Sequence, residues 1–476
     1  MDKIIDLAGA LSDLPHVKEE PNKNYIKMIE LKGIHKRYDL TVEFNQTLNI
    51  LYGQNGTGKT TLIHIISNLA NCDFIRFAFI EFANIKIVYS NSPTILISRN
   101  VTSSESGYRG GVIQVHVPEN DSTLKFSMRD AMESAKDQQL ELFSDEPASR
   151  LSDKVKKFVT KNNLNQISAS YFPAFRTLLE AWSSRKRENR SMGKYAVEDA
   201  TTFARELFGQ FLPRINYPSP LEIEKKLVDE IISCQVSIGR YENSIFSSSF
   251  IGVFSALLTG KDNDSNPTEL LKEISTLTKE STNNKFGDYQ EYGDVYERLR
   301  ELIQTIPTLS ETSVSGALEV YRDALKEKVM YQEEAFLAVN SYLEVVNFFL
   351  ENKELSYELS KERRRPTVGL KFPDGSWSNI KVMSSGERQL LTMLYAVNRM
   401  SGFSTVLIDE PEISLHIDWQ EDLLEKMMEQ LGNRQIIVCT HSPSIAADFD
   451  EYMKEIAPDF IEFEGDNFNS DDEENV

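Results

Sequence analysis

The sequence has 476 residues, 40% hydrophobic and 26% charged, so it is long enough for two or three globular domains. No apolar run approaches the ~20 residues that cross a bilayer, and the acidic N-terminus does not resemble a signal peptide. The net charge of −21 gives no long-range attraction to nucleic acid, and the three widely spaced cysteines form no disulfide or zinc pattern, so we expect a cytoplasmic protein with no membrane partner.

The first part of the chain predicts strands around a glycine-rich loop. Residues 1–24 are polar and predict a flexible leader. From residue 25, β-rich runs predict strands, the third of which ends in the loop. Residues 61–70 then show the apolar spacing of a helix. The strands predicted in this part lie at 26–31, 40–44, 48–51, 79–82, 85–89, 94–98 and 112–117.

The middle of the chain is mainly helical. Residues 128–165 are polar with a helical pattern, and residues 169–176 form a short apolar strand ending in a turn. A large helical block follows over 195–365, and its last part, 317–365, contains no Gly or Pro. If helical throughout, that part is ~70 Å long and forms an arm or half of a helical hairpin; a long core helix of a globular lobe is the alternative. Its apolar residues repeat at the three-and-four spacing of a coiled-coil seam: Phe336, Val339, Leu343, Val346 and Leu350.

Beyond Pro366 the pattern returns to strands. Asp374 and Gly375 stand between two alternating runs, 368–372 and 377–382, and predict a hairpin. A helix running to residue 400 follows, and two strand–helix units come after it. Their apolar strands are short, which is typical of a buried parallel sheet. The strands of these units are predicted at 405–408 and 435–439, with a helix at 419–431 between them.

The glycine-rich loop matches a phosphate-binding motif. Residues 53–60 fit GxxxxGK[ST] in full, between a predicted strand and a predicted helix. Its glycines let backbone N–H groups and the helix N-terminus face a phosphate. Lys59 reaches the β and γ phosphates, and Thr60 offers its hydroxyl to Mg²⁺. The predicted ATP contacts are Gly53, Asn55, Gly56, Gly58, Lys59, Thr60 and Thr61.

Two carboxylates follow the predicted buried strand at 405–408. Such a strand carries Asp409 to the carboxyl edge of the sheet, where it can hold Mg²⁺ through water together with Thr60. Glu410 is then placed to polarise the attacking water, as the catalytic base. With the phosphate-binding loop upstream, this pair predicts an ATPase whose cofactors are ATP and Mg²⁺.

Residues 384–389, Ser-Ser-Gly-Glu-Arg-Gln, resemble the LSGGQ signature of ABC ATPases. In that family, small residues at a helix start cap the γ-phosphate of an ATP held by a second copy. The resemblance therefore implies a head-to-tail homodimer with ATP sandwiched between the copies. It also implies that ATP is contacted by Ser384, Ser385, Gly386 and Glu387.

Two further segments resemble ABC motifs. His441 follows the last predicted strand and resembles the switch histidine, which contacts the γ-phosphate and belongs to the catalytic residues. Residues 411–416 resemble the D-loop, which crosses to the partner subunit. No glutamine stands out as the Q-loop residue. The predicted fold class is therefore α/β, an ABC-type P-loop ATPase head of mixed sheet flanked by helices, with a large helical or coiled-coil insertion.

The predicted division of the chain follows from these motifs. The two halves of the head are separated by the insertion, and both ends of the chain are polar, the C-terminal one acidic and expected to be disordered. The segments are a leader at 1–24, the N-terminal half of the head at 25–194, the insertion at 195–365, the C-terminal half at 366–460 and the tail at 461–476.

The long gap between the phosphate-binding loop and the signature resembles the SMC/Rad50 side of the superfamily rather than transporter subunits. Within it, residues 410–416, 440–443 and 171–176 resemble OLD-like ATPases. OLD nucleases carry a Toprim domain after the segment that matches 440–443, whereas few residues follow Pro443 in this sequence. The chain thus resembles the stand-alone ATPases of bacterial anti-phage systems such as Septu or PARIS.

This resemblance implies an ATP-hydrolysing sensor or scaffold subunit that assembles beyond a homodimer. It would control a separately encoded effector, an HNH nuclease as in Septu or a Toprim protein as in PARIS, with DNA or a phage protein as the trigger. Two other classes stay open: an SMC-like DNA-repair or DNA-tethering ATPase, and the ATPase subunit of a transporter. A neighbouring gene for a small nuclease or for a membrane permease would separate them.

Overall fold

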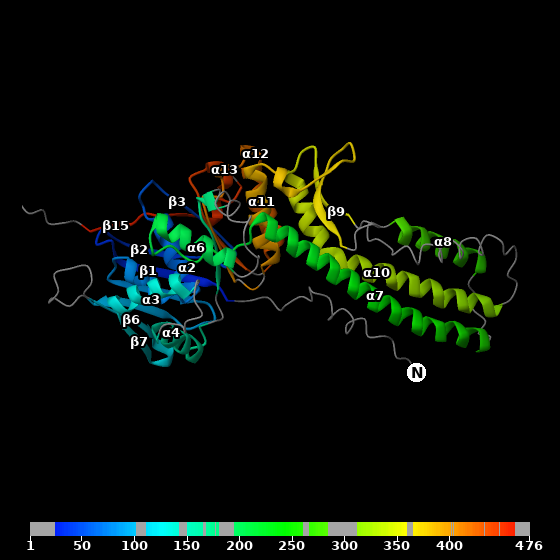
Figure 1. The fold of residues 1–476 in the computed structure, drawn as a ribbon, viewed down its shortest axis with the longest axis horizontal. Helices are drawn as coiled ribbons and strands as arrows, with labels where there is room; N and C mark the ends of the chain where they lie inside the picture. The colour runs from blue at the N-terminus through cyan, green and yellow to red at the C-terminus, as the bar shows by residue number, and fades with distance from the viewer. Residues whose placement is uncertain are drawn as a thin grey trace, which may run out of the picture. The chain divides into compact units, whose positions relative to one another are not determined.

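The structure, a computed structural model, divides into two compact units (Figure 1). The described part of the helical unit lies within 219–391, and that of the sheet unit within 24–218 and 392–461. The predicted leader and acidic tail lie outside the described residues except for Asn24 and Ile461, and the predicted domain limits stay predictions. The described residues are 24–100, 111–141, 150–164, 168–176, 178–179, 195–259, 266–283, 312–358, 365–400, 402, 404–432, 434–446 and 448–461.

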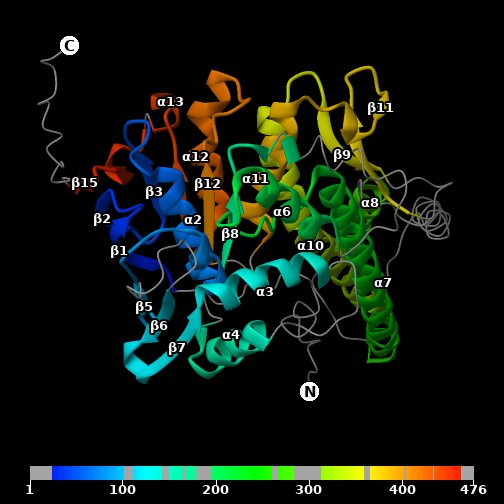
Figure 2. The same ribbon diagram turned by 60° about the vertical axis from the view of Figure 1, so that its left-hand side comes forward.

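The sheet unit contains a seven-stranded antiparallel sheet. Its strands alternate buried residues, nearly all apolar, with partly or fully exposed ones, as a sheet with one covered face requires. Helices α3 (Met128–Glu141) and α4 (Arg150–Lys161) lie beside its last strand (Figure 2). In spatial order the strands are β15 (Asp459–Phe460), β2 (Tyr38–Glu43), β1 (Ile26–Ile34), β4 (Asn84–Tyr89), β5 (Ile95–Asn100), β6 (Val112–Val117) and β7 (Ser122–Ser127).

The second sheet of this unit is parallel and has five strands. Two of its three inner strands are buried at every position, so they are covered on both faces, as the continuous apolar runs predict. Because all pairs are parallel, the carboxyl ends of the strands share one edge. The order is β14 (Met453–Glu455), β3 (Leu48–Tyr52), β13 (Gln435–Cys439), β12 (Thr405–Asp409) and β8 (Ala169–Phe172).

Helix α2 (Lys59–Ala70) packs on this parallel sheet and contacts β8, β12 and β13. The predicted strand at 79–82 is wrong, because the chain forms a 3-10 helix, η1 (Phe74–Phe79), and no strand there. Successive residues from Phe74 to Ala78 are all buried, a pattern that suits a short helix enclosed on all sides better than a strand with one open face. The remaining helices are α6 (Tyr195–Phe208), α12 (Ile417–Leu431), α13 (Pro443–Ala446), η2 (Pro118–Asn120) and η6 (Asp450–Tyr452).

The helical unit is built on a hairpin of two long helices, α7 (Pro220–Thr259) and α10 (Thr312–Phe349), with α8 (Pro267–Asn283) against α10. The two long helices run antiparallel, since Cys234 lies opposite Ala335, whereas Gly252 lies opposite Val320. The predicted seam is confirmed as a buried stripe, which comprises Phe336, Val339, Leu343, Val346 and Leu350.

The continuous helix considered for 317–365 is not formed. Helix α10 ends at Phe349, and the chain returns as strand β9 (Glu354–Glu358). Asn347 organises this turn, because its side chain donates to the carbonyl of Leu355 at 3.0 Å and accepts from the amide of Leu355 at 2.7 Å. Asn352 adopts a φ of 57°, which stops a helix as a glycine would.

The predicted hairpin at Asp374 and Gly375 is confirmed. Strand β10 (Thr367–Lys371) pairs antiparallel with β11 (Trp377–Ser378), and β9 adds a third strand on its other edge. The second predicted strand is shorter than expected, because the 3-10 helix η5 (Ile380–Val382) follows it. Helix α11 (Ser385–Arg399) comes next and continues into the sheet unit.

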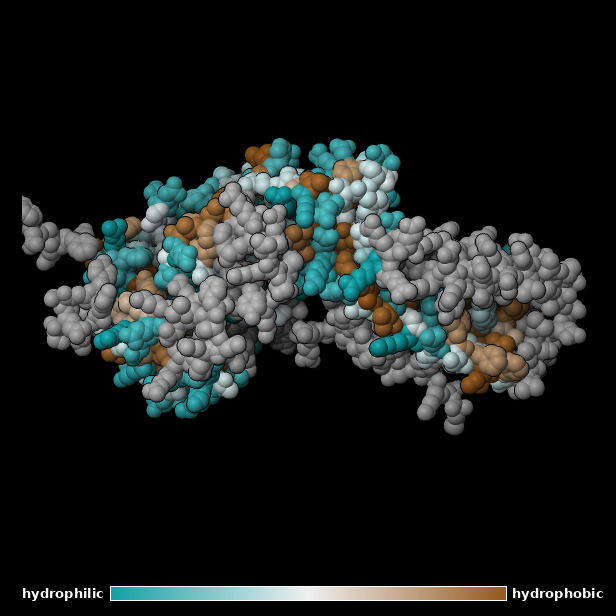
Figure 3. Space-filling model, in the orientation of Figure 1, coloured by the Kyte–Doolittle hydropathy of each residue, from teal (hydrophilic) through white to brown (hydrophobic). Residues whose placement is uncertain are grey.

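The surface of the helical unit carries exposed apolar side chains, visible as brown surface over α7 and α10 (Figure 3). Exposed apolar groups of this kind are typical of surfaces that contact another molecule. Among the described helices, none is both long enough and apolar enough to cross a membrane. On α7 and α10 the most exposed of these side chains are Phe250, Ile251, Phe254, Met330, Leu337 and Phe348.

Candidate nucleotide-binding and hydrolysis site

The predicted phosphate-binding loop joins β3 to α2 at the carboxyl edge of the parallel sheet. Gly56 and Gly58 have φ angles of 85° and 88°, which other residues rarely adopt. A Cβ atom at Gly58 would also overlap with the hydroxyl of Tyr38, whose ring lies against the loop. Glycine is therefore required at position 58 both by the backbone and by the space available.

Lys59 is buried beneath this loop. Its Nζ donates to the carbonyl oxygens of Gly53 at 2.9 Å and Gln54 at 3.1 Å, so the ammonium group is held beside the loop backbone. Of the other predicted contacts, Asn55 is exposed at the loop tip, and Thr61 is partly buried in the first turn of α2. An ammonium group in this position is suited to phosphate oxygens.

The two predicted Mg²⁺ ligands meet across the site. The Oγ1 of Thr60, in the first turn of α2, donates to Oδ2 of Asp409 at 3.1 Å. Asp409 ends strand β12 and is only 3% exposed, and this burial raises the pKa of its carboxyl to about 6, although the hydrogen bond from Thr60 opposes the shift. A cation bound between this carboxylate and the hydroxyl oxygen of Thr60 would stabilise the ionised form of Asp409.

These donors fit Mg²⁺. The ion is bound in proteins by one or two carboxylates, waters and substrate phosphates rather than by a cage of side chains. Accordingly, the described part of the chain has no cluster of three or more His, Cys, Asp or Glu residues arranged to hold a metal ion alone. Thr60 and Asp409 supply hard oxygens beside the phosphate-binding loop, which is the arrangement that a nucleotide-bound Mg²⁺ needs.

Glu410 and His441 follow neighbouring parallel strands and lie together. Oε1 of Glu410 is 3.3 Å from Nε2 of His441. Burial, followed by the negative charge of Glu412, raises the pKa of Glu410 to about 7. The backbone of Glu410 is unusual, because its φ of 51° lies in the left-handed region. A carboxyl group with a pKa near neutrality is suited to proton transfer.

Glu412 organises the loop that contains His441. Its Oε1 accepts from Thr440 Oγ1 at 2.7 Å, from the amide of His441 at 2.8 Å and from the amide of Ser442 at 3.1 Å. The hydroxyl of Ser442 in turn donates to Gln420 of α12 at 2.7 Å. One carboxylate thus ties the segment after β12 to the segment after β13.

The residues that resemble the ABC signature lie in the helical unit, at the start of α11. Ser384 and Glu387 form a capping box, in which the Ser384 amide donates to Oε2 of Glu387 at 2.7 Å and the Glu387 amide donates to Oγ of Ser384 at 3.3 Å. Lys353 pairs with Oε1 of Glu387 at 2.8 Å. Ser385 and Gly386 occupy the first helical turn between the two capping residues.

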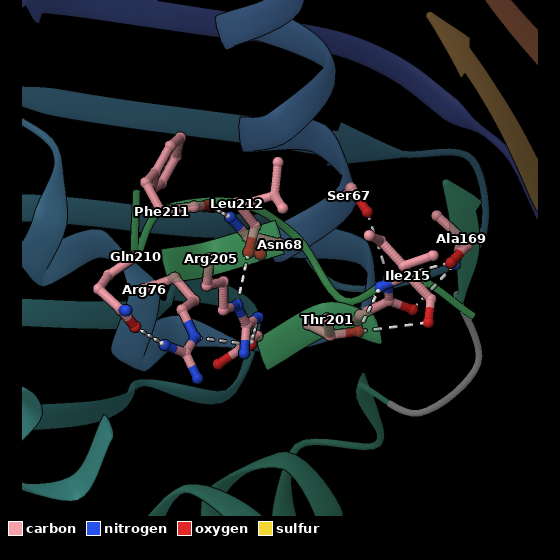
Figure 4. Close-up of polar contacts among 12 residues, drawn as sticks. Ser67, Asn68, Arg76, Ala169, Thr201, Arg205, Gln210, Phe211, Leu212 and Ile215 are labelled. Atoms are coloured by element: carbon pink, nitrogen blue, oxygen red, sulfur yellow. Dashed lines mark hydrogen bonds and ion pairs between the residues drawn. The ribbon is translucent and has the colours of Figure 1, made fainter. Parts of the chain in front are cut away.

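A polar network fixes the end of α2 that is remote from the phosphate-binding loop (Figure 4). Asn68 donates to the carbonyl of Phe211 at 2.8 Å. Arg76 and Arg205 both bond to Oδ2 of Asp73, at 3.2 Å and 3.3 Å. The pKa of Arg205 is lowered to about 10, mainly by burial and secondly by the positive charge of Arg76. The helix that carries Lys59 and Thr60 is thus anchored at its far end.

Reasoning from the sequence assigned no role to several residues that hold the candidate site residues. Glu412 lies in segments that resemble a D-loop and OLD-like ATPases, and Arg176 lies in a segment that resembles OLD-like ATPases, but neither is among the predicted site residues. The sequence positions of Tyr38 and Lys353 do not predict their contacts, because Tyr38 meets Gly58 and Lys353 meets Glu387 only in the folded chain. Polar residues directly after buried strands, such as Glu412 and Arg176, are the ones that could have been suspected.

Comparisons with known proteins connect the chain to a family of AAA domains. Residues 48–448 match the family described as AAA domain, putative AbiEii toxin, Type IV TA system. The chain is 31% identical to the Retron Vc95 probable ATPase of Vibrio cholerae serotype O1 biovar El Tor over 84 residues, 15% of this chain and 16% of that protein. It is also 31% identical to the Retron Ec83 probable ATPase of Escherichia coli over 80 residues, 14% of this chain and 15% of that protein. The matched region thus spans less than a fifth of either relative.

Solved structures of Smc head domains cover most of the chain at low similarity. One, with an extended coiled coil and bound to the C-terminal domain of ScpA from Pyrococcus furiosus, gives a TM-score of 0.40 at 15% identity over 92% of this chain and 96% of that one. Another, with a coiled coil and joint from Pyrococcus yayanosii, gives 0.33 at 13% identity over 90% and 94%. Scores this low add nothing to the fold described above. The family match, by contrast, covers most of the chain, so this protein belongs to the AAA-domain family that includes the putative AbiEii toxins.

Proposed function

We propose that this protein is an ABC-type ATPase that binds ATP·Mg²⁺ and hydrolyses it at a site completed by a second copy of the chain. One observation carries the proposal: two pairs of candidate residues converge at the carboxyl edge of the parallel sheet. Thr60 lies 3.1 Å from Asp409, and Glu410 lies 3.3 Å from His441. ATP hydrolysis requires that the groups which hold the metal ion and the phosphates lie close to the group which orients the attacking water.

Each residue has a role in this proposal. Gly53, Gly56 and Gly58 let the loop backbone approach the phosphates, and Lys59 exchanges its bonds to loop carbonyls for phosphate oxygens. Thr60 and Asp409 would hold a Mg²⁺ ion together with the nucleotide, and such an ion would neutralise charge on the phosphate oxygens. Burial raises the pKa of Asp409 to about 6, and a bound cation would lower it.

Glu410 is the proposed base. Its carboxylate accepts a proton from, or orients, the attacking water, and His441 holds that carboxylate from the other side at 3.3 Å. His441 itself is proposed to contact the γ-phosphate. Glu412 supports this arrangement, because it fixes the backbone of His441 at 2.8 Å.

The second copy supplies the signature. Ser384 and Glu387 stabilise the start of α11 through their capping box, which leaves Ser385 and Gly386 to present the helix N-terminus to the γ-phosphate of ATP on the partner. We propose a head-to-tail homodimer on this basis, and a higher homo-oligomer built from it.

The biological setting that we propose is bacterial anti-phage defence. The family description names toxins of a toxin–antitoxin system, and two partial relatives are named as retron probable ATPases. The OLD-like resemblance points the same way. The chain would act as the sensor or scaffold that controls a separately encoded nuclease, and the exposed apolar side chains of α7 and α10 are a surface available for such a contact.

The test is phosphate release by the purified protein with Mg²⁺ or with EDTA. Lys59→Ala should lose ATP binding, and Glu410→Gln should keep binding while hydrolysis falls by about 10²-fold or more. The exposed residues Lys125 and Glu421 provide matched controls as Lys125→Ala and Glu421→Gln. Full activity in Lys59→Ala or Glu410→Gln would show that the chemistry lies elsewhere.

The defence role needs a separate test. A neighbouring nuclease gene is expressed with this chain, and plaque formation is compared between wild type and Lys59→Ala. Protection that depends on Lys59 supports the proposal. Equal plaque numbers with and without the intact ATP site would remove the link between ATP and defence.

A further inference from the structure

Arg176 is a buried arginine, and three of its hydrogen bonds converge on the backbone beside the proposed base. The residue is 1% exposed and follows strand β8, the neighbour of β12 in the parallel sheet. Phe172 of β8 pairs with Ile408 of β12, so the ends of the two strands lie side by side. The chain turns after β8 and directs the guanidinium of Arg176 at the segment that follows β12.

The guanidinium donates to four carbonyl oxygens. Nη1 bonds to those of Pro173 and Asp409, both at 3.0 Å, and Nη2 bonds to those of Glu410 at 2.9 Å and Pro411 at 3.1 Å. Three of these acceptors are consecutive in the chain. Hydrogen bonds from a charged donor are stronger than neutral ones, and a planar fork fixes the direction of each bond.

The segment held in this way is the one with the strained backbone. Glu410 has a φ of 51°, which is costly for a residue with a Cβ atom and persists only where neighbouring structure enforces it. Its amide donates to the carbonyl of Cys439 in β13 at 2.9 Å, and its carbonyl accepts from Arg176. The backbone of Glu410 is therefore fixed on both sides, and its carboxylate is turned toward His441.

We propose that Arg176 is a positioning residue for ATP hydrolysis, because its guanidinium holds Asp409, Glu410 and Pro411 in the conformation that aims the Glu410 carboxylate. This inference rests on the proposed function of Glu410 as the base. Arg176 touches no part of the phosphate-binding loop through these bonds, and it holds Asp409 by the backbone carbonyl, which leaves the Asp409 carboxylate to Thr60. We therefore expect Arg176 to affect the hydrolytic step more than nucleotide binding.

The test compares Arg176→Met and Arg176→Lys with wild type in steady-state hydrolysis and in equilibrium binding of a fluorescent ATP analogue. Arg176→Met should lower kcat by about 10²-fold, the scale expected when a reacting group is displaced by ~1 Å. KM and analogue affinity should stay within about twofold, and Arg176→Lys should recover part of kcat, since an ammonium group can still donate to the same carbonyls.

Arg434 provides a matched control in the same unit. Its buried guanidinium donates to three backbone carbonyls, those of Leu431 at 3.2 Å, Ala396 at 2.9 Å and Met400 at 3.1 Å, at the ends of α12 and α11. Arg434→Met should lower the melting temperature as Arg176→Met does, without the loss of kcat.

A double-mutant cycle separates positioning from general stabilisation. If Arg176 acts through Glu410, Arg176→Met should change the residual rate of Glu410→Gln by no more than about twofold, because the carboxylate that Arg176 positions is already absent and the two effects are not additive. An additive loss in that background, or a normal kcat in Arg176→Met, overturns the inference. So does a failure of both Arg176 variants to fold while Arg434→Met folds. A wild-type protein without ATPase activity would instead overturn the proposed function itself.

Discussion

Nε2 of His441 and Oε1 of Glu410 lie 3.3 Å apart, although their strands are separated in the sequence by helix α12. They meet because β12 and β13 are adjacent and parallel, with Asp409 opposite Cys439 at the ends. Both residues stand just beyond this edge of the sheet, where parallel α/β folds bind their ligands. The predictions below concern the groups that hold this pair and groups that stabilise each unit separately.

Glu412 should be needed for its oxygen more than for its charge. Glu412→Leu removes the acceptor for Thr440, His441 and Ser442 and should lower kcat by about tenfold or more, because leaving the buried hydroxyl of Thr440 unsatisfied costs about 1–3 kcal/mol and the loop will rearrange. Glu412→Gln keeps an acceptor oxygen and should retain most of the activity. Phosphate release measures both, with Glu421→Gln as the surface control. Equal losses in the two Glu412 variants would assign the effect to charge.

Lys353 should support ATP-dependent association. Its ammonium group pairs with Glu387, which caps the start of α11. Lys353→Met removes a charged hydrogen bond between partly buried groups and should weaken ATP-dependent dimerisation by about tenfold. Sedimentation in ATP·Mg²⁺ measures this, with the exposed Lys371→Met as control. Unchanged association in Lys353→Met would mean that the capping pair has no part in the interface.

His64 should make the sheet unit sensitive to acid. Burial lowers the pKa of His64 to about 4 in the folded protein, whereas the unfolded chain takes up the proton near 6.5. The unfolded state therefore binds more protons between these values, and stability falls as pH drops through this window. At pH 5 the loss amounts to about 2 kcal/mol.

The variant His64→Gln removes this titration while keeping a polar partner for the hydroxyl of Tyr171, which lies 2.8 Å from Nε2 of His64. Urea denaturation at pH 7.5 and pH 5 should show that wild type loses about 2 kcal/mol more than the variant. Equal losses of unfolding free energy in the two proteins would show that the pKa of His64 is the same in the folded and the unfolded state.

The hairpin of the helical unit contains a buried ion pair, Lys328 with Glu242, at 3.0 Å. Lys328→Met leaves that carboxylate without its cation and should cost about 3–5 kcal/mol, whereas adding Glu242→Leu should recover most of the loss. Lys326→Met is the control, because the ion pair of Lys326 with Glu273 is about half exposed on both sides and is worth at most about 1 kcal/mol. Denaturation followed by circular dichroism measures all three; no recovery in the double variant would indicate that the pair itself determines the packing.

Much of the site could be predicted from the sequence because its motifs are local. The phosphate-binding loop needs Gly56 and Gly58 for positive φ angles, and the strand before Asp409 is a continuous apolar run, so both are visible in the order of residues alone. The convergence of Asp409 and His441 follows from parallel strands. The coiled-coil seam of α10 was visible for the same reason, since its spacing is a property of one helix.

The remaining features depend on contacts between distant segments. The end of α10 is set by Asn347, whose side chain bonds to the backbone of Leu355. Residues 317–365 contain no Gly or Pro, so the sequence did not predict that the helix ends there. The short strands β14 and β15 exist only because neighbouring strands offer free edges. Arg176 reaches the backbone of Glu410 across more than two hundred residues of sequence, which no local pattern encodes.

The most direct test is mass photometry of wild type, Glu410→Gln and Lys59→Ala, each with and without ATP·Mg²⁺. A site shared between two copies predicts an even-numbered oligomer that forms or tightens with ATP, most strongly in Glu410→Gln, where bound ATP persists, and not at all in Lys59→Ala. A mass that stays monomeric in every condition would contradict a shared site, and hydrolysis would then have to be explained within one chain.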